Sequence, residues 1–331
     1  MARSRLLLAV MSLGLAACAR RPAVEIREVC RAPTPGWAHD VSLESARAYV
    51  SDREGGMLVY SSPWGLGKPE WARPVRDVIS LSPNSGSPVL AARFEGIVAV
   101  SPSGQVTDRY SNGDIANAVE VRDGRAFAAY GLHGLVVASL KPRIRCLATL
   151  PSPGWSHDLR LSRNQALVAD WNYGLRVVDI STPDHPAEIA SLPSPATTIS
   201  LCVEDTGGRR LVALAEGHGG VGLAELDAAG RPRPLGRHFL GLHPGDRIHP
   251  ESGGWVHSIA WAGHYLLAAN WKKGVAVLDA ADPGRPRLVL EVRTRGTALG
   301  VKAQRQPDGS HLVFLADGEG GFAVYQFRAA R

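Results

Sequence analysis

The chain has 331 residues, of which 45% are hydrophobic and 21% charged, and its formal net charge is +6. These values are typical of a folded protein that buries a sizeable core, and they exclude a disordered or fibrous chain. The basic excess is mild and spread along the sequence. Because no dense Lys/Arg stripe with interleaved aromatic residues is present, we expect no nucleic-acid partner.

The N-terminus has the pattern of an export signal. Arg3 and Arg5 precede an apolar run from Leu6 to Leu15, and Leu-Ala-Ala-Cys ends the segment at Cys18. The run is too short for an ordinary membrane span. The ending resembles the lipobox of bacterial lipoproteins, and the alternative is a plain secretory signal in which the cysteine is incidental.

The lipobox resemblance implies a division of the N-terminus and a location. Residues 1–17 form the signal peptide, Cys18 carries the lipid, and residues 18–23 form the lipidated cysteine and a short tether. We therefore expect an exported protein whose membrane partner is reached through its N-terminal lipid. Ala19 after the cysteine implies the outer membrane of a Gram-negative cell envelope.

The rest of the chain is organised by a repeat. Seven segments begin with a small residue, have glycine five positions later, and continue as an alternating apolar run; they start at Ser51, Ala91, Ala129, Ala169, Ala215, Ala269 and Ala316. The period near forty residues is typical of a four-stranded propeller blade. Short apolar runs with turn residues flank each segment, and none has a helical period.

These observations predict an all-β, seven-bladed β-propeller over residues 24–331. The last repeat stops after its third strand, at Phe327, whereas the strand-like segment 24–30 precedes the first repeat. Pairing this N-terminal strand with the last blade closes the ring and removes an open edge.

The repeat segments resemble the LVIVD-repeat family of bacterial and archaeal surface proteins. The nearest copies are GLRVVDISTPDHPAEIASL at 174–192 and GVAVLDAADPGRPRLVL at 274–290. The resemblance extends over residues 24–327 and implies a propeller. It implies little about activity, because a fold does not fix a function.

Trp-x-His occurs three times, in GWAHD, GWSHD and GWVHS, ending at residues 40, 158 and 258. In the predicted ring these are the first, fourth and sixth blades, and each copy begins an innermost strand at the top face. His39, His157 and His257 should therefore face the channel mouth from three nearly even directions. Trp37, Trp155 and Trp255 more often pack between blades at such positions.

Other candidate residues belong to the same face. Asp52, Asp170 and Asn270 occupy equivalent loop positions in the same three blades, and Trp171 and Trp271 follow two of them. An insertion at 241–254 contains His243 and His249 and is expected to lie over the top as a lid. Long loops on rigid scaffolds are common functional sites.

Two kinds of chemistry fit this set. Neutral imidazoles ligate transition metals, so His39, His157 and His257 are candidate ligands of a divalent metal cofactor, with Asp52, Asp170 or Asn270 beside them. Zinc requires nitrogens about 2.0–2.1 Å away, so three separate blades must bring their side chains together. The alternative is structural: the histidines cap backbone groups, and loop Asp and Asn form turns.

Three functions remain open from the sequence. The first is non-catalytic binding of an envelope protein, a peptide or a carbohydrate through the histidine-rich top face. The second is a metal-assisted hydrolase or isomerase with its site at the channel mouth, to which His243 or His249 contributes. The third is an envelope assembly scaffold that uses the sides of the ring. Cys30, Cys146 and Cys202 fall on blades that are not neighbours, so we expect three free thiols.

Overall fold

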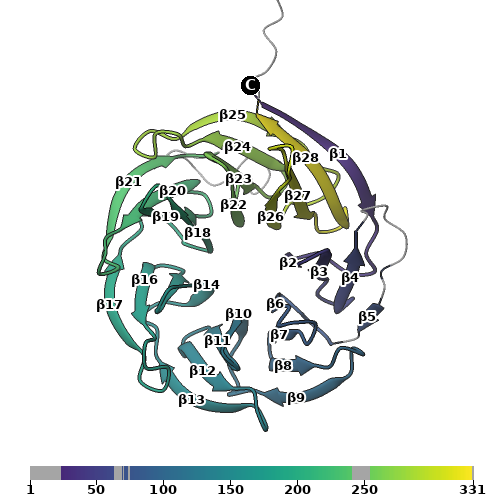
Figure 1. Ribbon diagram of the computed structural model, residues 1–331, viewed down its shortest axis with the longest axis vertical. Coiled ribbons are helices and arrows are strands. Elements are labelled where there is room, and N and C mark those ends of the chain that lie inside the picture. Colours follow the sequence, from purple (N-terminus) through teal and green to yellow (C-terminus); the bar gives the residue numbers. More distant parts are fainter. Residues whose placement is uncertain (1–23, 63–68, 70, 74, 241–253, 330–331) are drawn as a thin grey trace, which may run out of the picture.

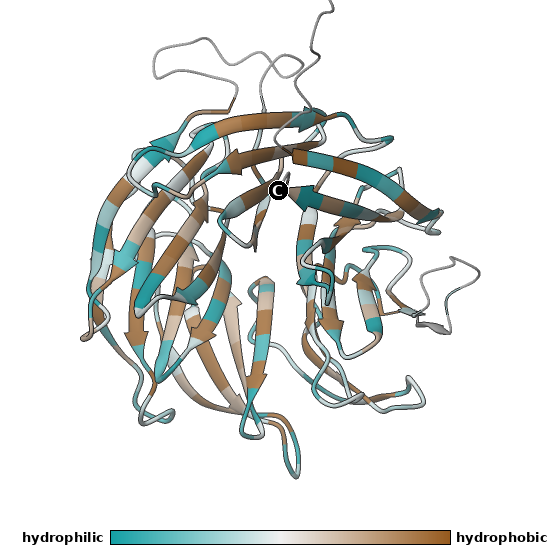
Figure 2. Ribbon diagram, turned by 45° about the horizontal axis from the view of Figure 1, so that its top comes forward, coloured by the Kyte–Doolittle hydropathy of each residue, from teal (hydrophilic) through white to brown (hydrophobic). Residues whose placement is uncertain are grey.

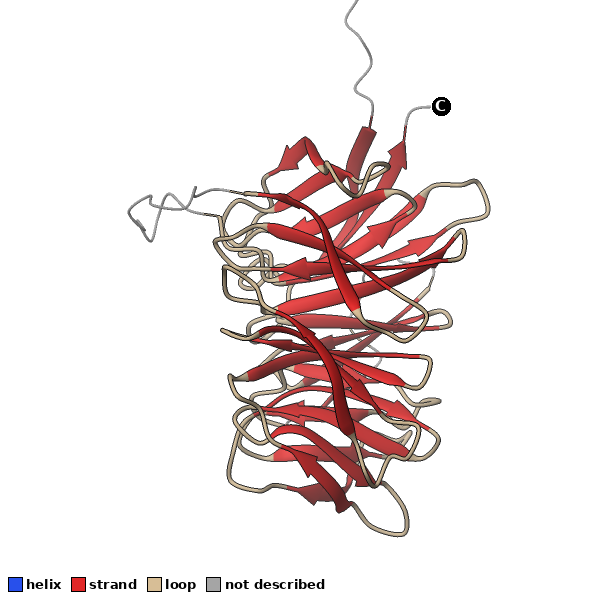
Figure 3. Cartoon of the chain, turned by 90° about the vertical axis from the view of Figure 1, so that its left-hand side faces the viewer, coloured by secondary structure: helices blue, strands red, loops and turns tan. Residues whose placement is uncertain are grey.

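The computed structural model of the protein describes residues 24–62, 69, 71–73, 75–240 and 254–329. These residues form seven antiparallel sheets of four strands arranged in a ring (Figure 1), as predicted. In side view the described part of the chain consists of strands and loops (Figure 3). It contains no helix of the length and apolar character needed to cross a membrane.

Each blade is one chain segment, except the seventh. From the channel outward, blade 1 contains β2 (Asp40–Glu44), β3 (Arg47–Ser51), β4 (Met57–Ser61) and β5 (Trp71–Arg73). Blade 2 contains β6 (Ser80–Ser82), β7 (Val89–Ala92), β8 (Gly96–Val100) and β9 (Val106–Tyr110). Blade 3 contains β10 (Ala116–Arg122), β11 (Arg125–Tyr130), β12 (Gly134–Ser139) and β13 (Arg145–Leu150).

The second half of the ring follows the same order. Blade 4 contains β14 (Ser156–Ser162), β15 (Gln165–Asp170), β16 (Gly174–Asp179) and β17 (Ala187–Leu192). Blade 5 contains β18 (Ser200–Thr206), β19 (Arg209–Ala215), β20 (Val221–Leu226) and β21 (Pro232–His238). Blade 6 contains β22 (Ser258–Ala262), β23 (Tyr265–Ala269), β24 (Val275–Asp279) and β25 (Arg287–Val292).

Blade 7 joins the two ends of the described chain. It contains β26 (Gly300–Arg305), β27 (His311–Ala316), β28 (Phe322–Ala329) and, outermost, β1 (Val24–Ala32). Val24 pairs with Ala329 and Ala32 pairs with Phe322, so β1 is antiparallel to β28 along its whole length. The prediction that the N-terminal strand closes the ring is confirmed.

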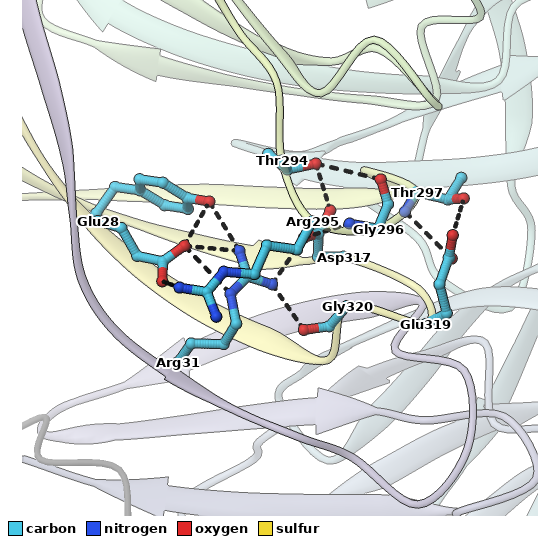
Figure 4. Close-up of polar contacts among 10 residues, drawn as sticks. Glu28, Arg31, Thr294, Arg295, Gly296, Thr297, Asp317, Glu319 and Gly320 are labelled. Atoms are coloured by element: carbon cyan, nitrogen blue, oxygen red, sulfur yellow. Dashed lines mark hydrogen bonds and ion pairs between the residues drawn. The ribbon is translucent and has the colours of Figure 1, made fainter.

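A buried polar network fixes this closure (Figure 4). The Arg31 guanidinium on β1 donates to the Asp317 carboxylate at 2.7 Å and to the Gly320 carbonyl at 2.6 Å, both in the loop before β28. It also contacts Glu28 and the Tyr325 hydroxyl. The Asp317 side chain is fully buried, so this ion pair is shielded from water.

The core is divided among the gaps between blades. Each of seven clusters of buried apolar side chains combines residues from two neighbouring blades; Phe314 and Phe322 of blade 7, for example, share a cluster with Val41 of blade 1. The middle strands are buried along most of their length, as in β16, whereas the outer strands, such as β25, are exposed or half-buried and include polar residues (Figure 2). This follows from burial on both faces inside the ring and on one face at its rim.

The two faces can now be assigned. We call top the face that carries the loops between second and third strands, such as 317–321 in blade 7. Because Ala32 pairs beside that loop and Val24 pairs with Ala329 at the other end of β28, Val24 lies at the bottom. The three remaining cysteines of the described chain lie on β1, β13 and β18 and are free, as predicted.

Candidate functional site: a histidine chamber in the central channel

Each Trp-x-His motif lies beside a glycine in the top loop of the preceding blade. The middle residue of each copy forms an isolated β-bridge with the loop of the blade before it: Ala38 with Gly318, Ser156 with Gly131, and Val256 with Gly217. A side chain on Gly318 would meet the Trp37 indole at 3.0 Å, and one on Gly217 would meet Trp255 at 3.3 Å. Trp37 and Trp255 thus pack against the neighbouring blade, as predicted.

With the tryptophan held on that side, the histidine of each copy turns toward the channel. The His39 and His257 rings lie edge to face with centroids 5.1 Å apart, and the His157 and His257 rings lie 6.1 Å apart. Three side chains from blades 1, 4 and 6 therefore converge. The equivalent positions in blades 2, 5 and 7 are Ile79, Ile199 and Leu299.

Each histidine is fixed by a backbone carbonyl of the following blade. His39 Nδ1 lies 3.0 Å from the Ile79 carbonyl, His157 Nδ1 lies 2.9 Å from Ile199, and His257 Nδ1 lies 3.1 Å from Leu299. A carbonyl oxygen only accepts hydrogen bonds, so Nδ1 carries the proton in all three rings. In a neutral imidazole the lone pair is then on Nε2.

The surroundings keep these rings neutral. Burial in the channel wall, together with the neighbouring His157, lowers the pKa of His257 to about 4. Burial also lowers the pKa of His39, together with the nearby His257, and burial lowers that of His157. All three Nε2 atoms are therefore hydrogen-bond acceptors at neutral pH.

The space among the rings, which we call the histidine chamber, is small. Its volume is about 30 Å³, and the three histidines share its lining with Asp40, Asp158 and residues at the starts of the four other innermost strands. A cavity needs roughly 10–15 Å³ of such space to hold one water molecule. The histidine chamber therefore has room for a water-sized group.

Aromatic residues continue the site toward the top surface. The Trp171 ring lies 5.5 Å from His157, and the Trp271 ring lies 6.5 Å from His257. Trp171 also lies 6.4 Å from Trp255. On the blade 1 side, Arg53 is close enough to disfavour the charged form of His39. The rim thus combines indole faces with one guanidinium.

The structure does not bring Asp52, Asp170 and Asn270 together with the histidines. They do not line the histidine chamber, and their side chains are fully buried in the loops. Asp52 accepts the Gly36 amide at 2.7 Å, and Asp170 accepts the Ser152 hydroxyl and faces Arg176 at 3.4 Å. These two carboxylates hold the segments that approach Trp-x-His. His243 and His249 lie outside the described residues.

A divalent metal is not supported by the side-chain geometry of the described residues. Within residues 24–62, 75–240 and 254–329, no group of three or more His, Cys, Asp or Glu side chains is arranged to hold a metal ion. The three rings are in the tautomer that leaves Nε2 free to ligate a metal. Although the rings converge, they do not form a ready-made set of ligands around one metal position.

A layer of charges beneath the histidines was missed by the sequence analysis. Asp40 and Asp158 follow the histidines directly, and Glu120, Arg160 and Lys302 face the channel one layer lower. Arg160 donates to Asp158 at 2.7 Å, and Asp158 accepts the Ser200 hydroxyl at 2.6 Å. The available signal was the two-residue period of the innermost strands, which places Asp158 and Arg160 on one side of β14.

Comparisons with known proteins agree with this architecture. Residues 153–192 and 253–294, which correspond to blades 4 and 6, match the LVIVD repeat. The chain carries LVIVD repeats. The chain matches no curated protein sequence.

Solved structures resemble this chain in fold alone. The β-propeller domain of Cps50 (Swd1) from Myceliophteria thermophila has a TM-score of 0.68 at 10% identity and covers 93% of this chain and 100% of that domain. The computationally designed Ika8 protein has a TM-score of 0.61 at 12% identity and covers 88% of this chain and 98% of the designed one. Function has to be inferred from the site.

Proposed function

We propose that this β-propeller repeat protein is a lipid-anchored binding protein of the bacterial cell envelope that receives its ligand through the top face without changing it chemically. The observation that carries the proposal is the set of three converging, neutral imidazoles that line one small space and have Nε2 as their acceptor atom. Acceptors of this kind select a hydrogen-bond donor. The group that enters is a hydroxyl or an ammonium of about the size of one water molecule.

The rim favours a ligand that is larger than the entering group. Trp171, Trp255 and Trp271 offer apolar faces of the kind that stack on sugar rings and aromatic side chains, and Arg53 adds a donor for an anionic or carbonyl group. The ligand class is therefore a carbohydrate or a peptide, presented either free or on an envelope protein. Its polar end enters the chamber while the remainder lies over the rim.

The anchor gives this face an orientation. Val24 lies at the bottom, and only Ala19 to Ala23 separate it from Cys18 in the sequence. Five residues span at most about 18 Å when fully extended. The lipid therefore keeps the bottom near the membrane and leaves the histidine chamber pointing away from it, toward a ligand in the periplasm or outside the cell.

Glycan and peptide arrays probed with the labelled mature protein test the proposal. We expect capture of a class of hydroxyl-bearing or amine-bearing ligands, and loss of that capture in the His157→Ala/His257→Ala variant. His185→Ala, which changes an exposed bottom-face histidine, is the matched control and should bind like the wild type. Capture that is unchanged in the double variant, or no capture by the wild type, would contradict a binding role for the chamber.

Metal analysis of the same preparations distinguishes the binding role from the metal-assisted enzyme. The binding role predicts that the wild type and the double variant contain the same trace amount of transition metal. A stoichiometric metal that is lost with His157 and His257 would instead support the metal-assisted hydrolase or isomerase.

A further inference from the structure

A second cavity lies in the channel below the histidine chamber. Its volume is about 310 Å³, and its charged lining consists of Asp40, Glu120, Arg160 and Lys302. Leu43 and Pro83 at its lower end are partly exposed, so this lower cavity reaches the bottom surface. The volume is at the small end of the range for small-molecule sites, about 300–1,000 Å³.

Lys302 is the residue of the lower cavity that is free to bind a ligand. It comes from β26 of blade 7, and within the described residues its ammonium makes no hydrogen bond and no ion pair shorter than 4 Å. Burial lowers its pKa, as does the nearby Arg160, while Asp40, Asp158 and Glu120 act in the opposite direction. The Lys302 side chain is half-buried, so water or a ligand has to complete the hydrogen bonds of its ammonium.

The other cation differs, because its partners are already in place. Arg160 donates to Asp158 at 2.7 Å and to the Leu159 carbonyl at 2.6 Å, and its Nε lies 3.8 Å from Glu120. Arg160 thus orients the cavity wall and adds positive charge. Lys302 is the cation left to contact a small anion.

Each carboxylate of the lower cavity uses only one of its two oxygens in a hydrogen bond. Asp40 accepts the Val41 amide through Oδ1 at 2.8 Å, and Glu120 accepts the Leu161 amide through Oε2 at 2.8 Å. Their second oxygens have no hydrogen bond in the described part of the chain. Acceptors for a cationic group and a donor for an anionic group therefore face the same enclosed space.

We propose that the lower cavity binds a small zwitterion with a primary ammonium and a carboxylate, of the size of a free amino acid. Its carboxylate contacts the Lys302 ammonium, and its ammonium contacts Asp40 and Glu120. A ligand with opposite charges explains why this cavity is lined by Asp40, Glu120, Arg160 and Lys302 instead of the apolar residues that fill the gaps between blades. The volume excludes a macromolecule.

This site is independent of the ligand proposed for the top face. The lower cavity is reached from the bottom and does not include the three histidines, although Asp40 and Arg160 border both spaces. The His157→Ala/His257→Ala variant should therefore retain zwitterion binding. Failure of one proposal leaves the other open to its own test.

Calorimetric titration of the mature protein with the standard amino acids tests the inference. We expect at least one amino acid to bind, and propionate and propylamine, which carry one charge each, to bind about tenfold more weakly or not at all. The absence of binding by every amino acid would overturn the proposal. Propionate or propylamine binding as tightly as the best amino acid would overturn it as well.

Variants locate the binding in the lower cavity. Lys302→Met and Glu120→Gln should each weaken binding by about tenfold or more, because the first removes the partner of the ligand carboxylate and the second removes one of the two partners of its ammonium. Arg305→Met changes an exposed cation on the same strand and should bind like the wild type. Thermal unfolding checks that each variant is folded; if Lys302→Met is not, Glu120→Gln decides. Unchanged affinity in the folded variants would contradict the assignment.

Discussion

The imidazole of His257 meets that of His39 edge to face across the channel, with ring centroids 5.1 Å apart, although the two residues come from blades 6 and 1. His257 disfavours the charged form of His39, His157 disfavours that of His257, and burial acts in the same direction on both. The channel therefore holds a set of histidines that stay neutral well below their ordinary pKa.

Acidification should destabilise the protein through these histidines. The unfolded chain protonates them near pH 6.5, whereas the folded pKa of His257 is about 4, so the unfolded state binds more protons between those values. The free energy of unfolding should fall as the pH falls through this window. Its contribution from His257 is at most about 3 kcal/mol, and less where channel water screens the ring. Urea unfolding at several pH values measures it.

A variant isolates this contribution from other groups. Burial raises the pKa of Asp40 and of Glu120, and these groups therefore act in the opposite sense as the pH falls. His257→Gln should have a shallower loss of stability between about pH 6.5 and pH 4 than the wild type. Parallel pH profiles for the two proteins would show that His257 has an ordinary pKa.

The buried ion pair of the closing strand should be important for stability. Arg31→Met leaves the Asp317 carboxylate buried without its cation, and we expect a loss of about 3 kcal/mol in the free energy of unfolding. Arg27→Met on the same strand removes an exposed cation and should change stability by no more than about 0.5 kcal/mol. Equal effects in chemical denaturation would mean that β1 does not depend on this network.

The sequence predicted the ring because its signals are local and repeated. Glycine at a fixed distance from a small residue marks the same turn in every blade, and Gly96 shows why: its φ is +83°, and a side chain there would meet the Tyr110 carbonyl at 2.1 Å. The strand order followed from this register, including the place of β1.

The interior of the channel was harder to predict because it depends on contacts between blades. Asp52 and Asp170 occupy the same loop position in their blades, and only the fold shows that their carboxylates turn toward Gly36 and Ser152 instead of the channel. Likewise, nothing near Lys302 in the sequence indicates that Glu120 and Arg160 face it from blades 3 and 4. Contacts between residues of different blades leave no local pattern in the sequence.

The three free cysteines should differ in reactivity. Cys146 is exposed on β13, whereas burial raises the pKa of Cys202 to about 12 and also raises that of Cys30. Because the thiolate is the reactive form, iodoacetamide at neutral pH should modify Cys146 first in the folded protein. Peptide mass spectrometry after timed quenching measures the order. Faster modification of Cys202 than of Cys146 would be inconsistent with its packing against the apolar cluster between blades 5 and 6.

Lipid attachment at Cys18 should orient the ring in liposomes. Spin labels at exposed Asn172 and Lys272 on the top should lie far from the bilayer, and labels at Arg125 and Arg209 on the bottom should lie near it, once the native cysteines other than Cys18 are replaced. The reason is the short tether to Val24 at the bottom. Collision with lipid-soluble and water-soluble relaxants measures the depth, and equal depths for the two pairs would refute this orientation.

The protonation of the three histidine rings is the most direct test of the histidine chamber. Nitrogen NMR of ¹⁵N-histidine-labelled protein at neutral pH, assigned with single His39→Gln, His157→Gln and His257→Gln variants, reports which ring nitrogen carries the proton. The carbonyl contacts of Ile79, Ile199 and Leu299 predict a neutral ring with protonated Nδ1 and bare Nε2 in all three. A charged ring, or a proton on Nε2, at any of the three positions would contradict a chamber of three hydrogen-bond acceptors.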